Sequence, residues 1–384
     1  MSQVISMTQR IEELERMLAA ENSGHSEMGD VQEMPRQAPA QVHRAVSSHR
    51  ELASSTAVNR PSPQFESTSA VLDPANNNYN VNKDATLAYT GTEELSLISE
   101  TQIDFWLTNA IAAASAQLHL PLNKVEHLFK TYLTWVFPVF LFVSRPHFLL
   151  GARYSSPLLI SVVCLQATRF TDHALKEELH SHVRLHLSQE IFREPSIPTV
   201  QALLQLSARD LGNGSLPQAW LYSGMAFRMA MDMGIFTRPR NPRDDPTDVA
   251  VRGHLAWSCF AWDKAVSLYL GRTPSLPEPP DFDPFVPDEA LEEKLWSPHL
   301  DTYSEGVTAL PVRCFGVSCF VNFCKLVVII NEILVTVYGK KPDRDPTLIR
   351  QIRGKLEDWW SNTPQHLRVE PTSQCPAPHV VSQK

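Results

Sequence analysis

The spacing of apolar residues at the start of the chain is that of a coiled coil. Between Val4 and Leu18 they recur at alternating three- and four-residue steps, as the a and d positions of a heptad do. The seam would consist of Val4, Met7, Ile11, Leu14 and Leu18. We predict a short dimerisation segment over residues 1–21. A frayed amphipathic end is the alternative, because convincing coiled coils sustain the pattern over about three to four heptads.

Residues 22–92 lack such periodicity and are rich in Ser, Pro, Gln and Asn. A segment of this composition buries too little apolar surface to offset the entropy lost on ordering. It is predicted to be a disordered linker.

Residues 93–384 form the third predicted part, where helical periodicity dominates from Glu93 to about Thr363. In the segment 196–212 one helical face is apolar, and Gly212 is predicted to cap its C-terminus. The next helix is predicted to begin after Ser215 as N-cap, with Pro217 in its first turn, and to end at Gly234.

The helix 216–233 carries a seam of small residues that would let a neighbouring backbone approach closely. These residues are Ala219, Ser223, Ala226 and Ala230. Because large apolar side chains occupy its other sides, we expect little of this helix to face water. Those side chains are Trp220, Met225, Phe227, Met229 and Met233.

Two further helices are predicted at 252–271 and 311–342, the second closed by Gly339 with Lys340 and Lys341 beside its negative end. Polar residues from Asn322 to Glu332 interrupt the second, so a soluble helix fits better than a membrane span. Alternating strand patterns are scarce. The predicted class is all-α, a multi-helix bundle of antiparallel helical hairpins.

Charge and cysteine usage narrow the possible functions. With 34 Lys and Arg against 42 Asp and Glu, the formal charge is -8, which gives no general attraction for nucleic acid. The cysteines are scattered without a C-x-x-C pair, and four of them have apolar neighbours. They are Cys164, Cys259, Cys314, Cys319, Cys324 and Cys375. This pattern, and an N-terminus unlike a signal peptide, indicate an intracellular, reducing compartment.

The sequence contains one candidate metal site. His182, His186 and Glu190 recur every four residues, so they share a helical face that in principle could bind zinc. Val183 stands where the general base of an H-E-x-x-H motif would be. A solvated histidine-rich face is the favoured interpretation.

Asp263 and Lys264 stand in the middle of an apolar helix. Adjacent helical residues point about 100 degrees apart, so we expect these two not to pair with each other. A structural network is expected to hold them instead, with a catalytic carboxylate as the alternative. The expected partners are Arg228, Asp232, Arg252 and Arg272. The sequence contains no P-loop or dinucleotide fingerprint, and no nucleophile elbow at Ser215.

Three segments occur in the order of one known family. They are TYLTWVFPVFLFVSRPHFL (131–149), SIPTVQALLQLSARDLGNGSLPQAWLYSGMAFRMAMDMGIF (196–236) and VRGHLAWSCFAWDKAVSLYLGRTPSLP (251–277). They resemble the middle homology region of fungal zinc-binuclear-cluster transcription factors, the fungal-specific transcription factor domain. The nitrate-assimilation and xylanolytic activator branch is the most similar. The resemblance covers roughly residues 99–379.

The resemblance implies an all-helical regulatory fold without catalysis, cofactor or metal in this chain. Residues at family motif positions are expected to be structural: Trp220, Gly224, Arg228, Asp232, Arg252, Trp257, Asp263, Lys264, Gly271, Arg272 and Pro274. In the family, zinc belongs to an N-terminal six-cysteine cluster that precedes the coiled coil. Here no cysteine precedes Cys164, and HLRVEPTSQCPAPHV (366–380) leads only into VSQK. We therefore expect a chain truncated at both ends.

The resemblance implies that the chain is the regulatory and dimerisation part of a zinc-cluster factor. Such a factor would regulate genes transcribed by RNA polymerase II, with those of a metabolic or biosynthetic pathway as one option. The expected partners are a second copy or related factors, the transcription machinery, and DNA only through a zinc cluster. The resemblance implies a nuclear location and no membrane. The first alternative is a stand-alone interaction protein that modulates full-length factors without binding DNA, and the second is an enzyme built in the helical core.

Overall fold

The structure, a computed structural model, describes residues 100–149, 154–171, 173–237, 244–298, 311–339, 345–368 and 376–381. The chain divides into two units, Met1–Val81 and Asn82–Lys384, and every described residue belongs to the second. The predicted coiled-coil segment 1–21 and the predicted linker 22–92 lie outside the described residues.

The described chain begins with a group of helices around the apolar helix α6. They are α3 (Glu100–Leu118), α4 (Leu122–Thr131), the π-helix η1 (Tyr132–Val136), α5 (Arg145–Leu149), α6 (Pro157–Ala167), the 3-10 turn η2 (His173–Leu175) and α7 (Lys176–Glu190). The Ser156 hydroxyl accepts a hydrogen bond from the Leu159 N–H and so begins α6. Nearly every residue of α6 is buried, because α4, α7 and α8 pack around it.

Helices α8 (Ile197–Gly212) and α9 (Leu216–Asp232) form a tightly packed hairpin. The Ser196 hydroxyl accepts from the Thr199 N–H and begins α8. The predicted small-residue seam of α9 is buried. At this seam the Ser207 hydroxyl of α8 donates to the Ala219 carbonyl at 2.7 Å, which is the close backbone approach that small residues permit.

Two details of this hairpin differ from the predictions. Gly212 is the last residue of α8 and Asn213 is its cap, while the left-handed backbone falls at Gly214, with φ 79°. The expectation that little of α9 would face water is also wrong, since Leu221 is 63% and Met231 46% exposed. α8 and α10 cover only part of the circumference of α9. Its predicted end is confirmed, with Gly234 at φ 64°.

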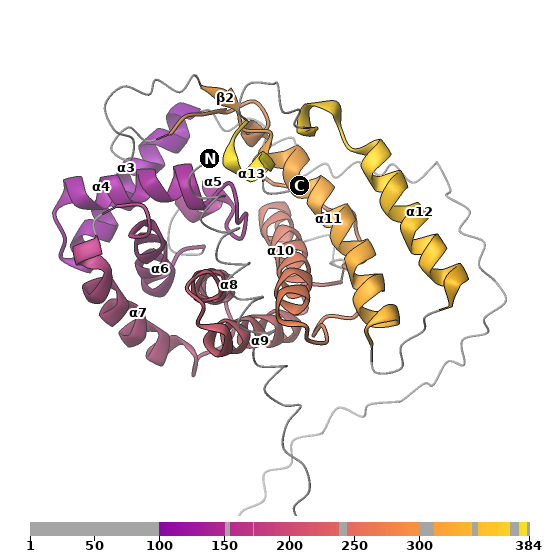
Figure 1. Cartoon of the computed structure of the whole chain (residues 1–384). Helices are drawn as coiled ribbons and strands as arrows, with labels where there is room; N and C mark the ends of the chain where they lie inside the picture. Colours follow the sequence, from indigo (N-terminus) through magenta and orange to yellow (C-terminus); the bar gives the residue numbers. More distant parts are fainter. Residues whose placement is uncertain are drawn as a thin grey trace, which may run out of the picture. The chain divides into compact units, whose positions relative to one another are not determined.

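Helix α10 (Pro246–Leu270) lies between α8 and α11 in Figure 1 and packs against α8, α9 and α11. The Asp245 carboxylate accepts from the Thr247 N–H at 3.0 Å and begins the helix. Gly271 ends it in the left-handed conformation, with φ 63°, which glycine adopts without a steric penalty.

The last long helices are α11 (Gly316–Glu332), continued by the π-helix η5 (Ile333–Val337), and α12 (Pro346–Asn362). They lie next to each other at one side of α10 (Figure 1). Short elements complete the described fold: η3 (Glu289–Leu291), β1 (Leu295–Trp296), β2 (Val312–Arg313), η6 (Gln365–Leu367) and α13 (Pro378–Val381).

The helix predicted over 311–342 is therefore shorter at both ends. Val312 and Arg313 instead pair with β1 in an antiparallel ladder, and Phe315, with φ 50°, turns the chain into α11. The helical run ends at Val337, with Tyr338 rather than Gly339 in the capping position. Lys340 and Lys341 lie outside the described residues. The all-α class is confirmed, because the described residues contain only this small ladder beside the helices.

The run Gly316–Val337 is long and apolar enough to cross a membrane, judged by length and composition alone. Core helices of soluble proteins meet the same criterion. In this structure α11 packs against α10 and α12.

Candidate functional site

Helix α10 uses its buried polar side chains to hold neighbouring backbone. The two ring nitrogens of His254 lie 2.7 Å from the Leu141 carbonyl and 3.1 Å from the Phe285 carbonyl. The Ser258 hydroxyl also bonds the Leu141 carbonyl, at 3.0 Å. The Trp257 indole N–H donates to the Phe282 carbonyl at 3.0 Å. These bonds fix two segments that have no regular backbone ladder of their own.

Asp263 and Lys264 form a fully buried ion pair. The Lys264 ammonium lies 2.7 Å from the Asp263 carboxylate, and both side chains are 0% exposed. The carboxylate also accepts from the backbone N–H groups of Ser275 and Leu276, each at 2.9 Å. The ammonium donates to the Leu276 carbonyl and lies 4.1 Å from the centre of the Phe260 ring. The pair thus ties the loop after α10 back onto the helix.

The expectation that these adjacent residues would not pair is wrong. Their Cα–Cβ bonds diverge, but the lysine stem is long enough for its ammonium to reach the carboxylate and the Leu276 carbonyl together. Burial lowers the pKa of Lys264, and the Asp263 carboxylate opposes that shift. Because its donors and acceptors are used on the loop, the pair contributes to the fold of α10 rather than to an open site.

The predicted partners of this pair lie elsewhere, so the predicted network is wrong. Arg252 donates to the Met233 carbonyl at 2.5 Å and lies 3.8 Å from Asp248. The Arg272 guanidinium stacks 4.9 Å from the centre of the Trp220 ring. Arg228 and Asp232 are exposed on the outer face of α9.

The family motif positions fall into two groups. Trp220, Gly224, Arg228, Asp232 and Arg272 lie on or against α9, where Arg228 donates to the Gly224 carbonyl at 3.4 Å. Arg252, Trp257, Asp263 and Lys264 belong to α10, and Gly271 and Pro274 to the loop that follows it. Within the described residues these positions do not converge on one cleft. Their assignment as structural positions stays a prediction.

The three candidate zinc ligands of α7 do not face a common point. The His182 and His186 rings stack 6.3 Å apart, but the Glu190 carboxylate accepts a hydrogen bond from the Thr199 hydroxyl of α8 at 2.6 Å. Glu190 thus joins α7 to the beginning of α8. In the part of the chain that the structure describes, no group of three His, Cys, Asp or Glu side chains could hold a metal ion.

The cysteines that the structure describes are all buried free thiols, and Cys375 lies outside the described residues. Burial raises the pKa of Cys314 to about 11 and that of Cys319 to about 12. It raises the pKa of Cys164, Cys259 and Cys324 as well. A thiol held protonated is a poor nucleophile, so these residues pack as small apolar groups.

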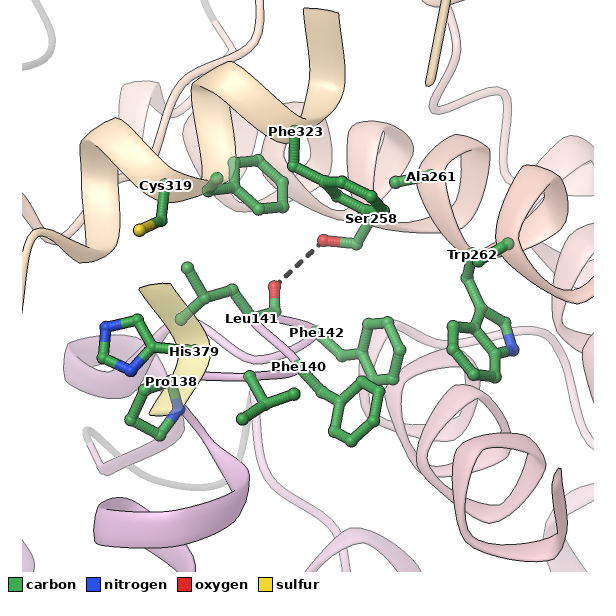
Figure 2. Close-up of a pocket in the computed structure, with 13 residues that line it drawn as sticks. Pro138, Phe140, Leu141, Phe142, Ser258, Ala261, Trp262, Cys319, Phe323 and His379 are labelled. Atoms are coloured by element: carbon green, nitrogen blue, oxygen red, sulfur yellow. Dashed lines mark hydrogen bonds between the residues drawn. The ribbon is translucent and has the colours of Figure 1, made fainter. Parts of the chain in front are cut away.

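An apolar cavity of about 220 Å³ opens beside α10. Figure 2 shows α10 and α11 facing the segment 138–142 across it, with His379 of α13 beside Pro138. Its walls are Pro138, Val139, Phe140, Leu141, Phe142, Ser258, Ala261, Trp262, Ala265, Cys319, Phe320, Phe323 and His379. Enclosed apolar cavities with a few polar groups are the usual form of small-molecule sites.

Few polar groups of the described residues reach this cavity, and none of the described residues that line it is Asp, Glu, Lys or Arg. The Ser258 hydroxyl bonds the Leu141 and His254 carbonyls. The Nε2 atom of His379 lies against the Cys314 carbonyl. Burial lowers the pKa of His379, which that hydrogen bond partly opposes, so the imidazole is neutral at neutral pH. The site is suited to binding by shape and not to acid–base chemistry.

The cavity and one buried ion pair were not predicted from the sequence. The Arg145 guanidinium bonds the Asp288 carboxylate through two nitrogens, at 2.8 and 3.3 Å, with both side chains almost fully buried. Arg145 is 143 residues from Asp288 in the chain. The sequence signal for such a pair is a charged residue inside an apolar segment, as Arg145 is in FVSRPHFLL.

Comparison with known proteins places this fold in a family. The fungal specific transcription factor domain matches residues 129–361. The chain is 30% identical over 280 residues to the nitrogen assimilation transcription factor nit-4 of Neurospora crassa, which covers 63% of this chain and 25% of that protein. It is 29% identical over 277 residues to the nitrogen assimilation transcription factor nirA of Emericella nidulans, covering 63% and 30% of the two chains.

A third relative is the TY1 enhancer activator of Saccharomyces cerevisiae, 31% identical over 169 residues, which cover 38% of this chain and 22% of the activator. The chain thus spans less than a third of the length of each of these relatives. No solved structure matches it. The match at 129–361 includes most of the segment from α4 to α12, so the chain belongs to the family of proteins with a fungal specific transcription factor domain.

Proposed function

We propose that this chain is the regulatory part of a transcription factor that acts on genes transcribed by RNA polymerase II. The observation that carries the proposal is the family match across residues 129–361, which contains α10 and the segments tied to it. The relatives are named as transcription factors or activators. Its place of action would be the nucleus.

The mechanism we propose is non-catalytic. The buried charges of α10 bind each other and the neighbouring backbone, and the thiols described above are protonated. The helical fold would restrain or release transcriptional activity through protein and small-molecule contacts. Partner choice would rest on the predicted seam at residues 4–18, in a homodimer or with a related factor, and DNA contact on a zinc cluster outside this sequence.

A tethering assay tests the role in transcription. The chain is fused to an unrelated DNA-binding module and placed upstream of a reporter gene in a fungal host. We expect reporter transcription to change severalfold relative to the module alone. The matched control carries Lys264→Met, which should weaken the effect by destabilising α10. An expressed, folded fusion that leaves the reporter unchanged would contradict the proposal.

Sedimentation of the chain with and without residues 1–21 tests dimerisation. A dimer that dissociates when the segment is removed supports the seam, because the shortened chain keeps every described residue. A monomer in both forms would exclude homodimerisation by this segment.

The net charge of -8 favours a second candidate, a modulator that binds full-length zinc-cluster factors without touching DNA. Co-purification of a zinc-cluster factor with the tagged chain would support it, provided that the complex is lost when residues 1–21 are deleted. Recovery of no such factor from the native host would count against it.

A further inference from the structure

The cavity beside α10 has the size and lining of a site for a small ligand. We propose that it binds a small, uncharged, largely apolar molecule such as a monocyclic aromatic compound, and that α13 is a movable part of its wall. The binding does not depend on the proposed function. Only the consequence of binding for transcription rests on it.

The volume sets the size of the ligand. The cavity measures about 220 Å³. An apolar cavity of about 150 Å³ holds benzene, and drug-sized ligands take roughly 300 Å³ or more. A single ring with a short substituent therefore fits, and a fused two-ring system that also carries a substituent would need a larger space.

Aromatic rings with fixed positions form one side of the cavity. Phe140 and Phe142 stack with their centroids 5.6 Å apart, and the Trp262 ring stands edge-on to both, at 5.8 and 5.5 Å. The Trp262 N–H donates to the Ser207 hydroxyl at 2.9 Å. The indole is thereby held from outside the cavity, and its carbon atoms face the ligand. Figure 2 shows Phe323 across the cavity from this group. Such rings favour an aromatic guest.

The same walls exclude charge. Among the described residues, no Asp, Glu, Lys or Arg lines the cavity, and the imidazole of His379 is neutral. An ion placed there would lose its hydration without gaining a partner. The Ser258 hydroxyl donates to backbone oxygens, yet its own oxygen keeps lone pairs that can accept one hydrogen bond from a ligand.

Helix α13 supplies a part of the wall that packs in a cluster of its own. His379 lines the cavity, while Ala377 and Val380 pack against Cys319 and Leu367 in a small cluster separate from the main core. The Nε2 atom of His379 lies against the Cys314 carbonyl and 3.5 Å from the Cys314 Sγ atom. A ligand that touches His379 and Cys319 adds contacts to the packing of α13. Binding of a ligand in the cavity and packing of α13 against the cavity must therefore stabilise each other.

The decisive experiment uses the full chain and an isosteric pair of probes. Acetophenone and benzoate have the same number of non-hydrogen atoms, but only benzoate is charged at neutral pH. Ligand-observed NMR should show saturable binding of acetophenone and at least tenfold weaker binding of benzoate. Equal binding of the two, or no binding of acetophenone at millimolar concentration, would overturn the proposal.

Two variants locate the site. Ala265→Leu fills the cavity from α10 and should abolish acetophenone binding, whereas Ala112→Leu, at an exposed position of α3, should leave it unchanged. Phe323→Ala enlarges the cavity and should admit 2-acetonaphthone, which the parent chain should reject. This gain of binding keeps the proposal testable if Ala265→Leu does not fold. Acetophenone binding unaffected by a folded Ala265→Leu chain would place the site elsewhere.

Hydrogen exchange tests the role of α13. Acetophenone should slow amide exchange at Ala377 and residues 379–381, and His379→Ala should weaken binding severalfold by removing a wall contact. Unchanged exchange in α13 at saturating acetophenone would overturn the coupling. Binding with these signatures, but without any effect of the probe on the tethered reporter, would refute only the regulatory consequence.

Discussion

Helices α10 and α11 run next to each other, and α11 is the more apolar of the two, but their side chains meet different surroundings. In α10, 16 of 25 residues are buried, including the charged Asp263 and Lys264. In α11 the buried residues number six of 17, and exposed apolar side chains such as Val328 and Val335 extend along α11 and η5. Burial thus follows the number of neighbouring elements and not apolarity alone.

This difference in burial suggests different structural roles for the two helices. α10 packs against α8, α9 and α11 and holds two loops through its polar side chains. α11 has α10 on one side and α12 on another. We therefore expect α10 to be a rigid support and α11 with η5 to be the more adjustable side, and the cavity opens between α10 and α11.

Breaking one ion pair in each region should give the largest difference between the two regions in lost stability. Lys264→Met leaves the Asp263 carboxylate buried and should lower the free energy of unfolding by about 3–5 kcal/mol. Lys355→Met removes the partner of Glu332, a pair at 2.7 Å in which the lysine is 53% exposed, and should cost less than about 1 kcal/mol. Urea denaturation measures both. Equal losses would contradict the contrast.

Acid should destabilise the fold through its buried histidines, among them His147 of α5 and His254 of α10. Burial lowers the pKa of His147 to about 4 and also lowers that of His254. The unfolded chain takes up these protons first, so stability is complete above about pH 6.5 and is lost as the pH falls towards 4. For His147 the loss should approach about 3 kcal/mol. His147→Phe should flatten the pH dependence of the urea midpoint in this range, and an unchanged slope would show that His147 does not titrate there.

Truncating one valine in each helix tests packing without charge. Val266 of α10 is 0% and Val328 of α11 38% exposed. Val266→Ala should cost about 2 kcal/mol through lost burial and the cavity left behind. Val328→Ala should remain within about 0.5 kcal/mol of the parent. Similar effects of both on the thermal midpoint would mean that the outer surface of α11 is covered in solution.

Removing a helix cap in each region should give the smallest difference in lost stability. Asp245 before α10 and Asp345 before α12 each accept a hydrogen bond from the N–H two residues later, at 3.0 Å. Replacing either by Ala should cost about 1 kcal/mol, because both caps are exposed. A much larger loss at Asp245 would show that the difference between the regions extends beyond buried side chains.

Local signals in the sequence predicted much of the helical framework. Ser215 and Gly234 mark the ends of α9, and the small residues of α9 lie at the predicted interface. Capping acts over a few residues, so it can be recognised without the fold. The same signals ended α8 at Gly212, which is its last residue, but they misassigned the cap, because Asn213 is the cap and the left-handed glycine is Gly214.

Contacts between distant segments could not be predicted. The cavity needs Phe140, Trp262, Phe323 and His379 together, and no periodicity relates such positions. The pairing of Asp263 with Lys264 depends on the loop at 275–276 folding back. Helical geometry alone argued against that pair. Burial of charge was foreseeable, but its partners were not.

Native-state hydrogen exchange tests most directly the claim that α10 is the rigid support and α11 with η5 the adjustable side. Amides of residues 254–266 should exchange only with the free energy of global unfolding, while those of 333–337 should exchange at a distinctly lower free energy. Equal protection of the two segments, or faster exchange in α10, would contradict the account.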